Sequence, residues 1–245
     1  MRDVILVGLG LIGGAVAMAL RRRGWRVRFV DQDPSLSLEG VERAGAPCDE
    51  DADVIVLATP VDAAVELLPS IETRGVVTSV GSVMRPLRAA ANARFVAGHP
   101  MAGWHEGGLA NAHHVELAGA SWFVDAHDER VDELIRACGA NPVLVTAEEH
   151  DAAVALTSHL PQVLSTALFA YLSDMPDIRK FAGGGLRSFR LAASDGEMWH
   201  SVLAANRDQL RPHAEQIARL VRAIIEGDEP GAFQRARALW RALTE

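Results

Sequence analysis

Short apolar runs alternate with amphipathic stretches along the first half of the chain. The runs are rich in branched side chains and end at glycine or polar residues, which is typical of buried strands. The predicted strands are 3–8, 27–31, 53–57, 76–80 and 95–97. Helical periodicity predicts helices between them, at 11–23, 35–44, 61–69 and 84–92. This alternation predicts a doubly wound parallel sheet of the α/β class.

The pattern breaks after Gly98. Residues 99–120 are rich in glycine, alanine and histidine and show no clear periodicity, so we expect a long ordered loop. Such loops are uncommon in compact domains and usually functional. A strand at 121–125, a helix at 128–138 and a strand at 142–146 are expected to complete the sheet domain.

Long helical patterns fill the remainder of the chain. The predicted helices are 148–172, 195–226 and 230–243. Pro161 interrupts the first and Pro212 bends the second, because proline removes an amide donor. Asp195 is the expected cap of the second helix. We therefore divide the chain into a sheet domain, 1–147, and an all-helical domain, 148–245.

The composition narrows the class of protein. The chain has 245 residues, 49% of them hydrophobic and 23% charged, with a formal net charge of −8. The apolar fraction excludes disorder, and the negative charge argues against nucleic acid as a partner. Cys48 and Cys138 lie far apart and are expected to be ordinary thiols. We expect no signal peptide and no membrane span, and therefore a cytoplasmic protein.

The turn after the first strand has the spacing of a dinucleotide-binding loop. G-x-G-x-x-G lies between a strand and a helix, which is the Rossmann-type context. Its coenzyme-binding positions are Gly8, Gly10, Leu11, Ile12 and Gly13. Asp31 ends the second strand, where a carboxylate accepts hydrogen bonds from ribose hydroxyls and repels a 2′-phosphate. These residues predict NAD rather than NADP as the cofactor.

Two histidine segments also suggest chemistry. His99 opens the long loop at the end of a strand, the edge where open α/β sheets bind ligands. Ser158 and His159 precede Pro161 on a helix, where the missing amide leaves a polar notch. A single histidine on such a helix is usually a core residue, but two such segments and a coenzyme loop favour a site.

At this point the sequence resembles the prephenate/arogenate dehydrogenase (TyrA) family. The resemblance rests on segments that occur in order along nearly the whole chain. They are VGLGLIGGAVA (7–17), ATPV (58–61), TSVGSV (78–83), GHPMAG (98–103), HD…SHLP (150–161) and AASDGEMW (192–199). The resemblance implies oxidative decarboxylation of a cyclohexadienyl acid, in which NAD takes a hydride and the ring becomes aromatic.

The family pattern also implies roles for particular residues. His99 would accept the proton of the ring hydroxyl, and Ser82 would hydrogen-bond the same hydroxyl. Ser158 and His159 would lie beside the substrate. Thr59 and Pro60, in the ATPV turn, would lie beside the coenzyme, and Trp199 would form a wall of the pocket.

A substrate carboxylate would be bound by an arginine near ASDGEMW. Arg190 matches the family's position best, and a one-residue shift in the alignment leaves Arg187 as a competitor. Both are arginines whose planar guanidinium suits a carboxylate.

Gln162 stands where the family often has a histidine near the substrate side chain. An amide there changes the recognition of a keto or an amino side chain. Prephenate, giving 4-hydroxyphenylpyruvate for tyrosine biosynthesis, is the expected substrate. Arogenate and a ring-amino analogue of prephenate remain alternatives. The family also implies a homodimer built through the C-terminal helices.

Two other functions fit part of the sequence pattern. A β-hydroxyacid or imine-type dehydrogenase shares the domain pattern, but the only lysine is Lys180, in a poor context. A non-catalytic NAD-sensing module would not need His99 beside the nicotinamide. The loop residues His105, Glu106, His113 and His114 fit no standard zinc spacing, so we expect no metal.

Overall fold

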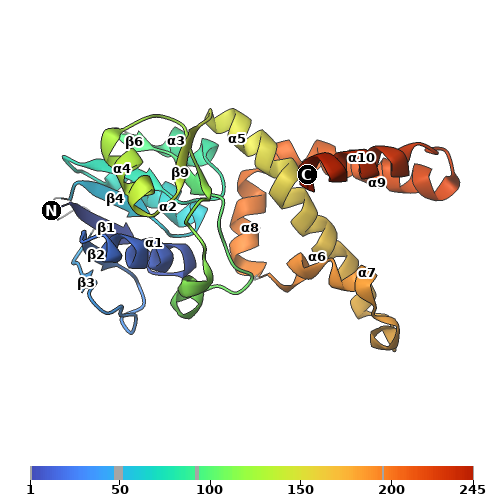
Figure 1. The fold of residues 1–245 in the computed structure, drawn as a ribbon, viewed down its shortest axis with the longest axis horizontal. Helices are drawn as coiled ribbons and strands as arrows, with labels where there is room; N and C mark the ends of the chain where they lie inside the picture. The colour runs from blue at the N-terminus through green and yellow to red at the C-terminus, as the bar shows by residue number, and fades with distance from the viewer. Residues whose placement is uncertain (1, 47–51, 92–93, 195, 245) are drawn as a thin grey trace.

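The computed structural model describes residues 2–46, 52–91, 94–194 and 196–244, and it confirms the expected α/β fold with a helical second half (Figure 1). One parallel sheet has the strand order β3-β2-β1-β4-β5-β6. Its strands are β1 Asp3–Val7, β2 Arg26–Val30, β3 Glu42–Arg43, β4 Val54–Leu57, β5 Val76–Ser79 and β6 Phe95–Val96. The order reverses between β1 and β4, and in such sheets ligands bind at the carboxyl ends of the strands at this point.

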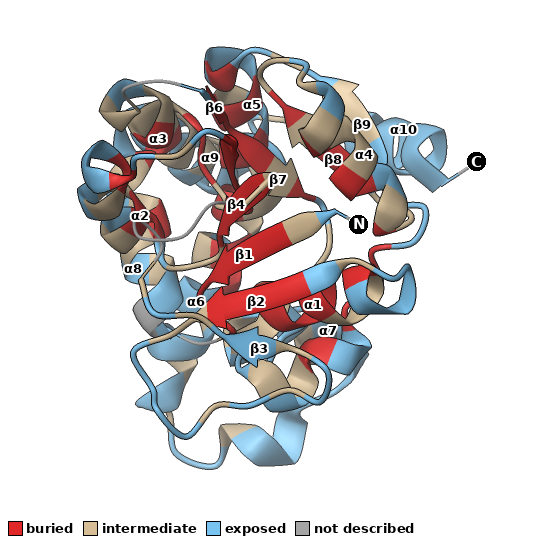
Figure 2. Cartoon of the chain, turned by 90° about the vertical axis from the view of Figure 1, so that its left-hand side faces the viewer, coloured by how far each residue is buried: buried red, intermediate tan, exposed pale blue. Residues whose placement is uncertain are grey.

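Helices cover both faces of this sheet. They are α1 Leu11–Arg22, α2 Val61–Leu67 with the short turn η1 Leu68–Ser70, α3 Arg85–Ala90 and α4 Glu129–Ala137. The strands β1, β4 and β5 are almost entirely buried between them. Figure 2 shows β1 and β4 mostly in red, the colour of buried residues. Side chains of alternate strand residues therefore enter two separate apolar clusters, one on each face.

The helix predicted at 35–44 is wrong. Residues 35–44 instead contain a bridge between Leu38 and Val41, followed by the short strand β3. The Arg43 guanidinium donates to the carbonyl oxygens of Asp31, Asp33 and Leu36 at 2.8–3.0 Å. These bonds satisfy the backbone in an extended loop, in competition with a helix.

The later strands do not join the main sheet as predicted. β7 Gly98–Pro100, β8 Ser121–Val124 and β9 Asn141–Leu144 form a second sheet of their own. β7 pairs with β8 in antiparallel fashion, opposite to the parallel pairing of β8 with β9. The loop between β7 and β8 contains the turn η2 Leu109–His114. The chain reversal at β7 therefore puts His99 on a separate sheet beside the end of β5.

The second half is helical, with breaks that the sequence pattern did not place. Its elements are α5 Ala147–Val154, the π-turn η3 Ala155–His159, α6 Leu160–Ser173, η4 Ile178–Phe181, α7 Gly184–Arg187, η5 Arg190–Ala193, α8 Gly196–Ala205, α9 Arg207–Glu226 and α10 Ala232–Thr244. The single helix expected over 195–226 is two helices that meet at Asn206, whose side chain is buried. The expected cap, Asp195, lies outside the described residues.

Helices α9 and α10 form a hairpin that projects away from the sheet (Figure 1). Several large apolar side chains on it are exposed. They include Val221, Ile225, Phe233, Leu239, Trp240 and Leu243. Solvent-exposed apolar side chains gathered on one projecting unit are typical of a protein interface.

One helical stretch, Ala147–Ser173, is long and apolar enough to cross a membrane by length and composition, with a hydropathy of 1.2. The core helix of a soluble protein passes the same test. Here the stretch contains three buried polar side chains: His150 contacts His99 of β7, Asp151 contacts the start of α3, and His159 contacts Asn206 at the start of α9. Those contacts favour a core helix.

Candidate active site

The glycine loop after β1 has the geometry of a dinucleotide-binding turn. Gly8 has φ +99°, and a Cβ there would lie 2.6 Å from the carbonyl oxygen of Ala58. A Cβ on Gly13 would collide with the carbonyl oxygen of Gly8. Gly10 has open space around it at the N-terminus of α1, where free amides can face a pyrophosphate.

Asp31 lies just beyond β2 and holds this loop in place. Its Oδ2 accepts from the amide of Leu9 at 2.7 Å, and its Oδ1 accepts from the amide of Asp33 at 2.9 Å. The carboxylate is half-buried, and each oxygen accepts one of these bonds and retains a further lone pair. This arrangement suits the two ribose hydroxyls of NAD and opposes a 2′-phosphate.

The other predicted coenzyme residues surround the loop. Leu11 and Ile12 form the first turn of α1 and pack on the apolar core. Thr59 and Pro60 follow β4, and Pro60 precedes the first turn of α2. The buried Thr59 hydroxyl has no partner among the described residues, and a buried polar group without one is costly. A hydrogen-bonding group of a bound dinucleotide fits this position.

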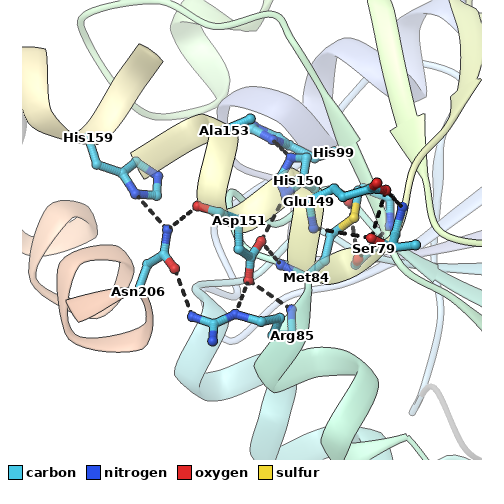
Figure 3. A network of polar contacts seen from close by, with 12 residues as sticks. Ser79, Met84, Arg85, His99, Glu149, His150, Asp151, Ala153, His159 and Asn206 are labelled. Atoms are coloured by element: carbon cyan, nitrogen blue, oxygen red, sulfur yellow. Dashed lines mark hydrogen bonds and ion pairs between the residues drawn. The ribbon is translucent and has the colours of Figure 1, made fainter. Parts of the chain in front are cut away.

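His99 belongs to a chain of three side chains (Figure 3). Its Nδ1 lies 2.9 Å from Nε2 of His150, and Nδ1 of His150 lies 2.8 Å from Oδ1 of Asp151. The two rings meet edge to face, with centroids 5.1 Å apart. His99 comes from β7, whereas His150 and Asp151 come from α5. The chain of contacts therefore joins the sheet to the helical half.

Asp151 is anchored by α3. Its carboxylate accepts from the amides of Met84 and Arg85 at 2.8 and 3.0 Å, and from the Arg85 side chain at 3.3 Å. Burial alone would raise the pKa of Asp151, but hydrogen bonds from His150 and the two amides outweigh it and lower that pKa. Asp151 is therefore an anion with a fixed orientation.

This anion determines which nitrogen of His99 carries a proton. An ionised carboxylate only accepts, so Nδ1 of His150 donates to Asp151. In the tautomer of His150 that has its one proton on Nδ1, Nε2 accepts from Nδ1 of His99, and the lone pair of His99 is then on Nε2. Burial and the neighbouring His150 and His159 lower the pKa of His99 to about 3. His99 is thus neutral at neutral pH, with Nε2 able to accept a proton.

The Asp151–His150–His99 contacts have apolar surroundings on one side. His150 lines a cavity of about 320 Å³ together with Met101, Phe123, Val154 and other residues. Phe123 meets the His150 ring edge to face, with centroids 5.6 Å apart. Apolar surroundings strengthen the polar contacts within the chain.

His159 is fully buried at the end of η3. Its Nδ1 lies 3.3 Å from Nδ2 of Asn206, and its ring meets Trp199 of α8 edge to face, with centroids 5.8 Å apart. Burial lowers the pKa of His159 to about 4, although Asp151 acts in the opposite direction. His159 and Trp199, both predicted at the site, are therefore brought together.

The two predicted serines are close in sequence to this network. Ser82 is half-buried in the turn between β5 and α3, two residues before Met84. Ser158 is half-buried in η3, next to His159. No hydrogen bond of either hydroxyl is found within the described part of the chain. Both hydroxyls therefore have their hydrogen-bonding capacity available for a ligand.

Gln162 is buried and already has three partners. Its Nε2 donates to the carbonyl oxygen of Leu191 at 2.9 Å and to the Thr166 hydroxyl at 3.2 Å. Its Oε1 accepts from the Ser194 hydroxyl at 3.3 Å. Gln162 thus braces the η5 turn, and one lone pair of Oε1 is left for a substrate.

The two candidate arginines lie on the exposed side of the same region. Arg190 begins η5 and Arg187 ends α7, and both are exposed. Over the described ranges, neither guanidinium has an ion-pair partner. Both are therefore available to a carboxylate.

The loop between β7 and β8 gathers aromatic rings without forming a metal centre. Trp104 stacks on His114, with centroids 4.6 Å apart, and lies against His105. His113 lies against His114, at a centroid distance of 3.9 Å. Outside 47–51 and the other masked positions, no group of three His, Cys, Asp or Glu residues is placed to hold a metal ion.

Sequence reasoning missed four residues of the site. His150 and Asp151 were part of the HD motif but had no assigned role, and Arg85 and Asn206 were not singled out. The HD motif was the available signal, because adjacent imidazole and carboxylate groups on one helix suggest an orienting pair. Arg85 and Asn206 depend on tertiary contacts that spacing does not reveal.

Comparison with known proteins places the chain in a family. The family described as "Prephenate dehydrogenase, nucleotide-binding domain" matches residues 16–137, and "Prephenate dehydrogenase, dimerization domain" matches residues 146–236. The prephenate dehydrogenase of Lactococcus lactis is 27% identical, over 89% of this chain and 71% of its own. That of Bacillus subtilis is 28% identical, over 86% of this chain and 66% of its own.

A solved structure agrees over the full length. Prephenate dehydrogenase from Aquifex aeolicus, in complex with hydroxyphenyl propionate and NAD⁺, is 25% identical, with a TM-score of 0.81. The alignment covers 100% of this chain and 98% of that one. The match over both domains favours this family over the β-hydroxyacid, imine-type and non-catalytic alternatives. The chain therefore belongs to the prephenate dehydrogenase family of NAD-dependent dehydrogenases.

Proposed function

We propose that this protein catalyses the NAD-dependent oxidative decarboxylation of prephenate to 4-hydroxyphenylpyruvate. The observation that carries the proposal is the Asp151–His150–His99 chain, because it presents a neutral imidazole nitrogen at the end of the sheet that carries the glycine loop. When bound beside Gly8 and Asp31, NAD supplies the hydride acceptor.

The protein's own residues accept the proton and hold the catalytic imidazole in position. Nε2 of His99 accepts the proton of the ring hydroxyl as the carbon beneath it is oxidised, and loss of the ring carboxylate as CO₂ then leaves an aromatic ring. His150 and Asp151 hold the imidazole in the required tautomer, as a buried carboxylate does for other catalytic histidines. Ser82 donates to the hydroxyl oxygen.

The helical half is proposed to hold the remainder of the substrate. Ser158 and His159 of η3 and Trp199 of α8 form the polar wall of the pocket. Arg190 binds a carboxylate, with Arg187 as the alternative. Gln162 contributes to substrate binding in one of two ways: directly, through the free lone pair of its Oε1, or indirectly, by holding the η5 turn in place.

Arogenate remains the second candidate substrate, followed by a ring-amino analogue of prephenate. Gln162 favours this possibility, because the free lone pair of its Oε1 can accept from an ammonium group. Comparison of kcat/KM for prephenate and arogenate separates the two.

We also propose a domain boundary between residues 147 and 148, a homodimer through the C-terminal helices, and a cytoplasmic location. The family matches end at 137 and resume at 146, and α5 begins at Ala147. The exposed apolar side chains of α9 and α10 support the dimer.

The test is the formation of NADH, followed by its absorbance, with prephenate and then arogenate. We expect turnover in the native protein and a loss of roughly two to four orders of magnitude in kcat for His99→Asn, the usual scale for acid–base catalysis. His127→Asn is the matched control, because His127 is exposed and pairs with Asp132 instead. Tight NADH binding without turnover on any cyclohexadienyl acid would refute the proposal.

A further inference from the structure

Asn206 is a fully buried side chain that touches both histidine systems. It lies at the junction of α8 and α9, and its amide has three partners. Its Oδ1 accepts from Nη2 of Arg85 at 3.0 Å. Its Nδ2 donates to the carbonyl oxygen of Asp151 at 2.7 Å and lies 3.3 Å from Nδ1 of His159 (Figure 3).

Two of these partners fix the orientation of the amide. A guanidinium only donates, so the Asn206 atom facing Arg85 is the oxygen. A backbone carbonyl only accepts, so the atom facing Asp151 is the nitrogen. The second hydrogen on Nδ2 then points to Nδ1 of His159, which must present a lone pair.

The proton of neutral His159 is consequently on Nε2. That atom is buried and has no hydrogen-bond partner among the residues that the structure describes. The neighbouring Trp199 also has a buried Nε1–H without an acceptor over the same residues. Two buried donors on rings that touch edge to face indicate that an oxygen acceptor belongs near them, because an unsatisfied buried donor is costly.

Given the proposed function, we propose that Asn206 is a positioning residue that holds His159 as the neutral Nε2–H tautomer, a donor to a carboxylate oxygen of the cyclohexadienyl acid. His99 then has the opposite tautomer, with its lone pair on Nε2. One imidazole accepts from the ring hydroxyl, and the other donates to an anionic oxygen.

The groups around His159 support a neutral ring. Asp151 of α5 is the nearby anion, and its charge is shared by His150 and by Arg85. Arg85 is further paired with Asp208 of α9 at 2.7 Å. Trp199 of α8 adds no charge. The contact to His159 from the α9 side is therefore the uncharged amide of Asn206, which leaves the ring without a counter-ion of its own.

The direct test is ¹⁵N NMR of histidine-labelled protein, because the two ring nitrogens have different shifts when protonated or bare. We expect a protonated Nε2 and bare Nδ1 for His159, and the reverse for His99. His159→Gln and His99→Asn assign the signals by loss. Nδ1 protonation of His159 in the native protein would overturn the proposal, even if the enzyme turns over prephenate.

Asn206→Asp provides the second test, since a carboxylate must accept rather than donate. We expect the His159 proton to move to Nδ1, or the ring to gain a second proton, with KM for prephenate raised about tenfold and kcat less affected. Asn141→Asp is the same change on an exposed asparagine of β9, and it should alter neither the His159 spectrum nor KM for prephenate. An unchanged His159 spectrum in folded Asn206→Asp contradicts the proposal.

Ligand titration identifies the acceptor. Hydroxyphenyl propionate has only a side-chain carboxylate, whereas prephenate has a ring carboxylate as well. A shift of the His159 Nε2–H signal with both ligands, each added with NADH, assigns the side-chain carboxylate as acceptor. A shift with prephenate but not with hydroxyphenyl propionate assigns the ring carboxylate as the acceptor. Binding of both ligands without any shift overturns the donor role, and it leaves the proposed reaction intact.

Discussion

Asp151 serves two imidazoles with different atoms. Its side chain accepts from His150, whereas its backbone carbonyl accepts from Asn206, which in turn faces His159. All of these groups are buried, so removing one partner would leave a charge or a donor unsatisfied in the interior. The network is thus a single unit, and substitutions within it are expected to be non-additive.

Coenzyme choice is a property of Asp31. Asp31→Asn keeps an oxygen that can accept from the Leu9 amide but removes the negative charge. We expect KM for NAD to rise and the preference for NAD over NADP to fall by about tenfold or more, because the repulsion of a 2′-phosphate is lost. Steady-state kinetics with both coenzymes at saturating prephenate measure this ratio.

Asp33→Asn is the control for this change. Asp33 lies in the same loop, is exposed, and bonds to Ser35. It should leave the coenzyme ratio close to that of the native protein. An Asp31→Asn enzyme with an unaltered ratio would show that another residue selects the coenzyme.

Residues with strong local signals could be predicted from the sequence, and residues fixed by tertiary contacts could not. The glycine loop and Asp31 each follow a strand, and His99 lies in the GHPMAG segment, so all of them have a local sequence signal. Asn206 has no such signal, because its role depends on a carbonyl 55 positions away and on a guanidinium 121 positions away. Long-range polar contacts of this kind are invisible to periodicity.

At the scale of elements, Pro161 shapes the helix that carries the site. It has no amide to donate to Thr157, and the preceding residues 155–159 form a π-turn. The wider turn changes the angular spacing between His150 and His159, so that the two rings serve different neighbours. The sequence predicted an interruption here, but not its form, because a proline is compatible with a kink, a break or a π-turn.

The packing of η2 against α1 depends on a glycine outside the fingerprint. A Cβ on Gly14 would lie 2.6 Å from Cδ1 of Leu109 and 2.8 Å from Cβ of Ala112. We expect Gly14→Ala to lower the free energy of unfolding by roughly 1–3 kcal/mol, because either α1 or η2 must move. Urea unfolding of the apo-protein measures this.

Gly185→Ala is the matched control for that element. A Cβ there meets nothing within 4 Å, and the residue is inside the short helix α7. Alanine at this position should be neutral or stabilising by less than about 1 kcal/mol. Equal stability of Gly14→Ala and the native protein would mean that η2 packs less tightly than described.

At the scale of the whole molecule, buried neutral histidines make the fold sensitive to acid. The pKa of His99 is lowered to about 3 and that of His159 to about 4, from an ordinary value of 6.5. Between these values and 6.5 the unfolded chain binds protons that the folded protein does not. The free energy of unfolding is therefore greatest above pH 6.5 and falls as the pH drops towards 4 and then 3.

In that pH window, we expect each of the two histidines to contribute up to about 1.4 kcal/mol per pH unit to the slope of the free energy of unfolding against pH. His159→Gln should remove its part of the slope, whereas His127→Gln, at an exposed position, should not. Urea unfolding at a series of pH values provides the slopes. Identical slopes for native protein and His159→Gln would show that His159 is not buried in its neutral form.

The assembly of two chains is tested on the exposed hairpin of α9 and α10. Trp240 is 70% exposed and Leu243 is 75% exposed. Burial of such large apolar side chains against a partner contributes strongly to the free energy of association. Trp240→Glu would place a charge in that interface. We expect the dissociation constant of the dimer to rise at least about a hundredfold, measured by light scattering after size-exclusion chromatography.

Ala238→Glu adds the same charge two residues earlier, on the opposite side of α10, and should leave the dimer intact. Activity gives a second reading of the two variants. If the covered hairpin also steadies α9, and with it Asn206 at its start, then dissociation should lower kcat/KM without changing the coenzyme preference set by Asp31. A monomeric native protein with full activity would separate assembly from catalysis in this chain.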